Sequence, residues 1–79
     1  MNRSINKQDM LVEVFKTNVS HPAEAREIVN MLQRKFPVHR FNFALDDGDR
    51  ILRTVGPSVF TDKIIEAVRE LGFYAEVLE

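Results

Sequence analysis

The stretch that decides the fold is Lys16–Phe36, with the sequence KTNVSHPAEAREIVNMLQRKF. It begins as a polar loop and continues as an amphipathic helix, since apolar residues recur at the i, i+3, i+4, i+7 spacing of one buried face. Those residues are Ala25, Ile28, Val29, Leu32 and Phe36. Ser20 or His21 can cap the helix, and Pro22 suits its first turn. Pro37 then ends it.

The composition indicates one domain with one core. The 79 residues have a net charge of −1, and the scattered charges give no basic patch for nucleic acid or an anionic membrane. The absence of cysteine excludes disulfides, thiolate metal sites and cysteine nucleophiles. No apolar run approaches the ~20 residues of a membrane span, and Met1–Asp9 lacks the apolar core of a signal peptide. We therefore expect a cytoplasmic domain over residues 10–79, preceded by a flexible tail over residues 1–9.

The rest of the chain supplies four expected strands and a second helix. The strands are expected at residues 10–15, 38–45, 50–55 and 73–78, which are rich in β-branched and aromatic residues. The Asp-Gly step within Asp46–Asp49 indicates a hairpin, and Thr61 is a good cap for a helix that ends before Gly72. This order predicts an α+β, ferredoxin-like βαββαβ fold, with a four-stranded antiparallel sheet of order 4-1-3-2 and both helices on one face.

The strand at residues 10–15 can face the helices in two ways. In the first, the inward residues are Met10, Val12 and Val14; in the second, they are Leu11 and Phe15, with Glu13 between them. We prefer the first, because it leaves the Glu13 carboxylate in solvent. Phe15 then lies on the uncovered face of the sheet, with Tyr74 and Leu78 of the last strand. We expect these three residues to form a surface for a protein partner or a second copy.

Two later segments carry a family resemblance. They are Pro37-Val38-x-x-Phe41-x-Phe43-x-Leu45 and Ile64-x-x-Ala67-Val68-x-x-x-Gly72-Phe73-x-Ala75. With them, the chain from Ala25 onward resembles a heavy-metal-associated domain, the module of copper chaperones and of the N-terminal segments of metal-transporting ATPases. The matching positions are largely core and turn positions, so the resemblance implies the same fold.

The resemblance also implies a metal site in the loop before the first helix, where the family carries Met-x-Cys-x-x-Cys. Counting back along the helix puts His21 and Glu24 at the two cysteine positions and Val19 at the methionine. A histidine and a carboxylate suit Zn²⁺ or Ni²⁺ better than Cu(I). A tight site usually needs three or four ligands, and His39 is expected at the opposite end of the sheet. His21 and Glu24 therefore predict no resident cofactor and at most a weakly bound divalent metal.

No pattern of residues indicates catalysis. Ser20 and His21 are sequence neighbours without a placed third group, whereas a nucleophile–base pair is defined by geometry. The phosphate loop of acylphosphatases and the paired aromatics of RNA-recognition motifs are also missing. We predict a non-enzymatic protein-interaction or regulatory module derived from metal-handling domains. Binding or transfer of Zn²⁺ or Ni²⁺ at the loop is the alternative. A small-molecule regulatory domain of the ACT type, which has the same element order, is a further one.

Overall fold

A computed structural model describes residues 10–46 and 48–78. Its elements are β1 (Leu11–Thr17), α1 (Pro22–Lys35), β2 (Arg40–Ala44), β3 (Ile51–Gly56), α2 (Thr61–Glu70) and β4 (Ala75–Val77). The expected order of strands and helices is confirmed. The segment over residues 1–9, which we expected to be a flexible tail, lies outside the described residues.

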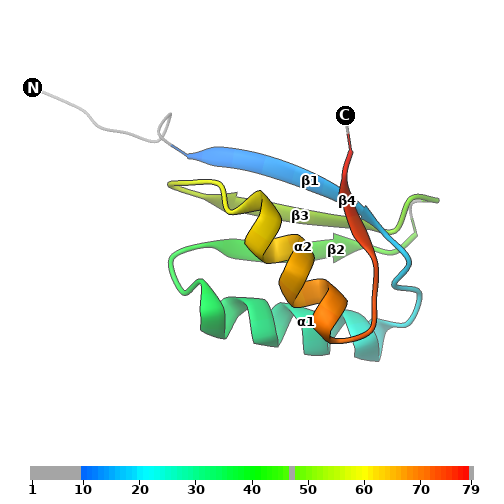
Figure 1. Ribbon diagram of the computed structural model, residues 1–79. Coiled ribbons are helices and arrows are strands. Elements are labelled where there is room, and N and C mark those ends of the chain that lie inside the picture. The colour runs from blue at the N-terminus through cyan, green and yellow to red at the C-terminus, as the bar shows by residue number, and fades with distance from the viewer. Residues whose placement is uncertain (1–9, 47, 79) are drawn as a thin grey trace, which may run out of the picture.

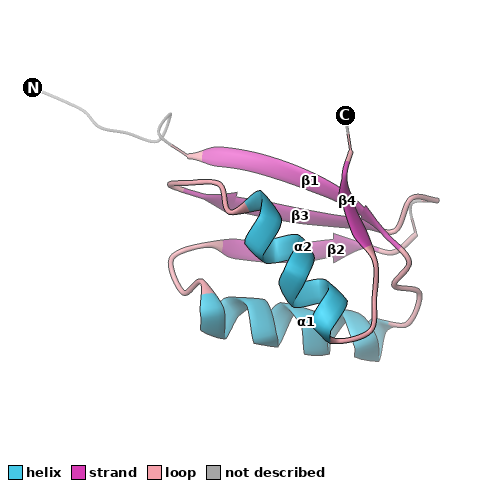
Figure 2. Cartoon of the chain, in the orientation of Figure 1, coloured by secondary structure: helices cyan, strands magenta, loops and turns pink. Residues whose placement is uncertain are grey.

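The four strands form one antiparallel sheet in the order β2-β3-β1-β4. This is the expected order 4-1-3-2 read from the opposite edge. Both helices lie on the same side of the sheet (Figure 1), which is consistent with a ferredoxin-like arrangement. Within the described residues no helix or strand covers the other face of the sheet, as the secondary-structure view shows (Figure 2). The sheet therefore has one face in the core and one uncovered face.

The core lies between the helices and the covered face of the sheet. Its central row crosses all four strands, because Phe43 pairs with Leu52, Leu52 with Phe15, and Phe15 with Val77. Phe15 and Leu52 are completely buried. The helices contribute the buried residues Ala25, Ile28, Leu32, Ile64, Ala67 and Val68. The α1 residues among them fall on the helical period read from the sequence, so the expected inward face of this helix is confirmed.

The expected orientation of β1 is wrong. Phe15 faces the helices, whereas Met10 and Val12 are 49% and 54% exposed. The sequence favoured the opposite orientation because it leaves the Glu13 carboxylate in solvent. In the structure the half-buried Glu13 carboxylate accepts hydrogen bonds from the Thr61 hydroxyl, at 2.9 Å to Oε1 and 2.8 Å to Oε2. Since Thr61 begins α2, the carboxylate also lies at the positive end of the helix dipole, which reduces the cost of its burial.

Candidate functional site

The two expected metal-ligating residues stand at the start of α1. His21 is exposed and occupies the N-cap position, but its side chain makes no capping hydrogen bond. Glu24 follows in the first turn of the helix. Nowhere in residues 10–46 and 48–78 do three or more histidine, cysteine, aspartate or glutamate side chains group so that they could hold a metal ion. Among these residues, His21 and Glu24 therefore have no third ligand.

Thr17, the last residue of β1, and Asn18, the first residue after it, fix the start of the loop before α1. The buried Thr17 hydroxyl donates a hydrogen bond to the Arg50 carbonyl at 2.6 Å and accepts one from the Val19 N–H at 3.1 Å. The Asn18 side-chain oxygen accepts a hydrogen bond from the Tyr74 N–H at 2.8 Å. These bonds tie the end of β1 to the start of β3 and to the segment before β4. The loop is therefore a structural joint at this end of the sheet.

His39 lies at the opposite end of the sheet, as expected, and it is buried, which the sequence did not indicate. Its Nε2 lies 2.8 Å from the Ser58 carbonyl, and because a carbonyl only accepts, Nε2 must donate. Nδ1 is buried with no hydrogen-bond partner among the described residues. The ring packs against Phe36, Phe41 and Phe60, at centroid distances of 6.0, 6.2 and 5.3 Å. His39 thus joins the end of α1 and the start of β2 to the segment that leads into α2.

Gly56 makes room for this histidine. A Cβ at position 56 would lie 2.6 Å from Cγ and from Nε2 of His39, and closer still to Cδ2. The β2–β3 register, continued by one residue beyond Arg40 and Val55, sets Gly56 opposite His39. A glycine facing an aromatic ring across two strands was therefore the signal in the sequence that could have placed His39 in the core.

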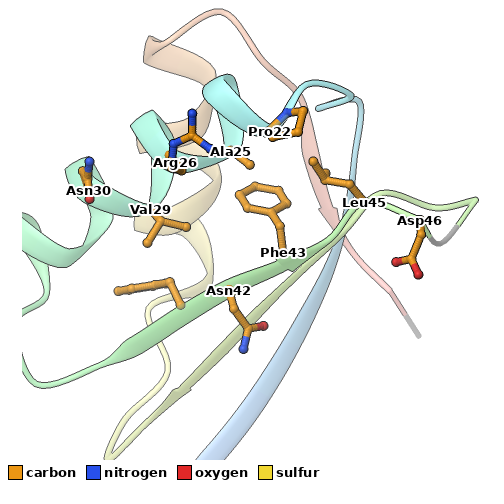
Figure 3. Close-up of a pocket in the computed structure, with 10 residues that line it drawn as sticks. Pro22, Ala25, Arg26, Val29, Asn30, Asn42, Phe43, Leu45 and Asp46 are labelled. Carbon is orange, nitrogen blue, oxygen red and sulfur yellow. The ribbon is translucent and has the colours of Figure 1, made fainter.

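A shallow pocket of about 540 Å³ lies between α1 and β2. Phe43 points from β2 toward α1, between Ala25 and Val29, whereas Asn42 and Asp46 point away from the helix (Figure 3). Polar groups that converge on one point are what orient a small ligand or a reacting atom in a site. Since Asn42 and Asp46 point away from α1, which carries the other polar lining residues Arg26 and Asn30, the polar groups of this groove do not converge on one point.

The uncovered face of the sheet carries neighbouring apolar side chains from several strands. Alternation along the strands puts even-numbered residues of β1 and odd-numbered residues of β3 on this face. Leu78 lies beside them, because its N–H bonds to the Val14 carbonyl at 2.9 Å. We define the aliphatic patch as Val12, Val14, Ile51, Val55 and Leu78. Val12 is 54% and Leu78 is 40% exposed, and the other three are partly exposed.

The expected partner-surface residues are divided between this face and the core. Tyr74 and Leu78 are exposed, at 49% and 40%. Phe15 is buried, so its expected place beside Tyr74 on the partner surface is wrong. The Tyr74 hydroxyl donates a hydrogen bond to the Glu76 carboxylate. Of the expected surface, Leu78 and the edge residue Tyr74 therefore remain accessible.

Comparison with known proteins adds no functional description. No family model matches the chain, and no solved structure matches it. Sixty residues of the chain are 33% identical to "Uncharacterized protein 26" of Sulfolobus islandicus filamentous virus (isolate Iceland/Hveragerdi). The match covers 75% of this chain and 51% of that protein, so the chain spans about half the length of this relative. Neither helix of the described chain is long and apolar enough to cross a membrane.

Proposed function

We propose that this chain is a small non-enzymatic binding domain that docks a partner protein on the uncovered face of its sheet. The aliphatic patch is the observation that carries the proposal. Aliphatic side chains from β1 and β3, together with Leu78, lie next to one another there without a covering element among the described residues. Contiguous apolar surface of this kind is typical of interaction sites, because covering it removes apolar area from water.

The size of the face suits a modest protein interface. Four strands at ~4.8 Å spacing and the seven residues of β1 at ~3.3 Å each give a face of roughly 19 by 23 Å. A partner that covers this face and its flanking side chains would approach the lower range of specific interfaces, which begins near a total of about 1,200 Å². The proposal therefore describes reversible docking of one partner domain or segment.

The element order is the one expected for a domain derived from heavy-metal-associated domains. We propose that such a domain has here a binding or regulatory role and does not transfer metal. His21 and Glu24 offer two metal ligands. The Thr17 hydroxyl is already hydrogen-bonded to Arg50 and Val19, and the Asn18 side-chain oxygen to Tyr74. A metal held by two protein ligands would exchange readily with water and with chelators. A small-molecule regulatory role finds no support in the α1–β2 groove, whose polar residues Asn42 and Asp46 do not converge on it.

Two valine-to-glutamate variants test the proposed surface. Val12→Glu places a charge in the aliphatic patch, whereas Val38→Glu makes the same change at a valine that is 68% exposed in the turn before β2. Each variant is immobilised and used to capture proteins from the cells that produce this chain. A captured protein is then purified, and its affinity for each variant is measured by calorimetry. We expect Val12→Glu to weaken binding by about tenfold or more, because the glutamate must be desolvated on docking, and Val38→Glu to leave it unchanged.

The same assay includes the loop variants His21→Ala and Glu24→Ala. Both should bind the partner as the parent does, because the start of α1 lies outside the proposed surface. Circular dichroism checks that every variant keeps its helix and strand content. Loss of the partner by the loop variants, with binding retained by Val12→Glu, would show that the loop and not the sheet face is the working surface.

A further inference from the structure

The uncovered sheet face carries a local positive charge on a chain whose net charge is −1. Arg40 and Arg53 are exposed there on β2 and β3. At one end of the face, Lys16 lies directly opposite Glu76, so these two charges offset each other. Within the four strands, Glu76 is the acidic residue of this face, and its carboxylate already accepts the Tyr74 hydroxyl. Asp46, which also points away from α1, follows the end of β2. Neither arginine has an acidic residue opposite it on a neighbouring strand, because Arg40 pairs with Val55, and Arg53 pairs with Val14 and Asn42.

Two of the three cross-strand rows on this face separate the charges from the aliphatic side chains, whereas the third places Lys16 of β1 beside Ile51 of β3. One cross-strand row runs from Val12 through Val55 to Arg40. The next row runs from Leu78 through Val14 and Arg53 to Asn42. In both rows the aliphatic residues lie toward β1 and β4, and the arginine lies toward β2. The face therefore presents an aliphatic lane beside a cationic lane, and an occupant that matches both must itself be apolar along one side and acidic along the next.

The form of the occupant follows from the backbone of the sheet. Backbone groups in the interior of this face are paired between neighbouring strands, so an occupant must satisfy its own backbone hydrogen bonds. An α-helix does so. Apolar residues four apart on a helix are spaced by ~6 Å, close to the ~6.6 Å between alternate residues of β1. We infer that the uncovered face binds an amphipathic helix of a partner protein, with carboxylates along the flank that meets Arg40 and Arg53. This inference rests on the proposed function and specifies the form and charge of the partner segment.

Other occupants fit the face less well. A second copy docked through the same face would bring two sets of uncompensated arginines together, and like charges oppose such an interface. Single-stranded nucleic acid binds through stacking on aromatic side chains as well as through cations. The aliphatic patch offers no ring for stacking, and Tyr74 stands at its edge with its hydroxyl bonded to Glu76. Charge and apolar surface together favour an acidic helix.

A pair of model peptides tests this inference. Both are acetylated and amidated helices of about 18 residues, or roughly 27 Å, with leucine along the apolar side and alanine elsewhere. One carries glutamate and the other lysine along the flank next to the leucines. Binding is followed by NMR on ¹⁵N- and methyl-labelled protein. We expect the glutamate peptide to shift the signals of Val12, Val14 and Val55 and to bind about fivefold or more tightly than the lysine peptide.

Charge reversal supplies the matched comparison. Arg53→Glu should invert the preference between the two peptides, whereas Arg34→Glu, the same change at an exposed position in the last turn of α1, should leave it unaltered. Equal binding of both peptides to the face would overturn the acidic helix but leave the proposed docking surface standing. If neither peptide shifts signals of the face, the acidic helix is overturned, and the docking surface is decided separately by the affinity of the captured partner for Val12→Glu.

Two further results would each overturn the inferred occupant. The first is a concentration-dependent dimer in sedimentation that Val12→Glu abolishes, which would make a second copy the occupant. The second is binding of a thymidine oligonucleotide that depends on Arg53 and displaces the glutamate peptide, which would make the face a nucleic-acid site.

Discussion

Replacing Gly56 by alanine tests the packing at the end of the sheet opposite the α1 loop. The added Cβ would lie 2.6 Å from Cγ and Nε2 of His39 and closer still to Cδ2, so the ring must move by more than about 1 Å to reach an ordinary contact of ~3.5–4 Å. The ring is held by the hydrogen bond to the Ser58 carbonyl and by three phenylalanine rings. Loss of the hydrogen bond costs ~1 kcal/mol, and disturbance of the aromatic packing costs a similar amount. We expect Gly56→Ala to lower the free energy of unfolding by about 2–3 kcal/mol.

A double-mutant cycle shows whether that cost comes from the histidine. In a His39→Ala background the clash is absent, and Gly56→Ala should change stability by less than about 1 kcal/mol, because alanine also reduces the entropy of the unfolded chain. The coupling between the two positions should therefore be about 2 kcal/mol. Urea unfolding followed by circular dichroism measures all four proteins. An osmolyte such as TMAO, present throughout, keeps the less stable variants folded at zero urea.

The result that would refute this reasoning is additivity. If Gly56→Ala costs the same free energy with and without the His39 ring, then the ring does not fill the space beside position 56. A second contradiction would be a Gly56→Ala protein as stable as the parent, since the structure leaves no room for the extra carbon without movement of the ring.

Three other predictions concern β1, its carboxylate and the loop. Phe15→Ala should destabilise the domain by about 3–5 kcal/mol, and Val12→Ala by less than about 1 kcal/mol, as measured by urea unfolding; the opposite ranking would restore the other orientation of β1. Thr61→Val should cost about 1–2 kcal/mol because Glu13 loses its hydrogen-bond donor, and an unchanged midpoint would mean that water replaces the hydroxyl. The protein should lose Cu(I) to a chelator of moderate affinity, and retention of one equivalent of Cu(I) would contradict this prediction. Any weak Zn²⁺ binding seen by titration should disappear in His21→Ala, and unchanged Zn²⁺ binding would place the site elsewhere.

The element order and the helix faces could be predicted because they rest on local patterns. The apolar residues of α1 recur at one period, and Pro22 and Pro37 lie at or beside its ends, so its position needs no information from the rest of the chain. The same holds for α2, where Ile64 and Val68 are buried at the i, i+4 spacing of one helix face. These features depend on residues that are close in sequence.

The orientation of β1 could not be predicted in this way, because it depends on a residue 48 positions away. A glutamate between two apolar residues favours the strand orientation that exposes it, unless the core supplies a hydrogen-bond donor for its carboxylate. The Thr61 hydroxyl is that donor, and its distance in sequence hides it from any local pattern. His39 was missed for a related reason, since its burial depends on the absent side chain of Gly56 on the neighbouring strand. The error in β1 changed the candidate site, because the orientation of β1 decides which side chains reach the uncovered face.

The central claim is that the uncovered sheet face is the binding surface, and methyl NMR with the captured partner tests it most directly. Valine methyl groups report separate surfaces of the molecule: Val12 and Val14 lie on the uncovered face, Val29 lines the α1–β2 groove, and Val38 lies in the turn before β2. On addition of the unlabelled partner, we predict that the signals of Val12 and Val14 shift or broaden while those of Val29 and Val38 stay in place. Shifts at Val29 with none at Val12 and Val14 would contradict the claim and move the binding surface to the groove.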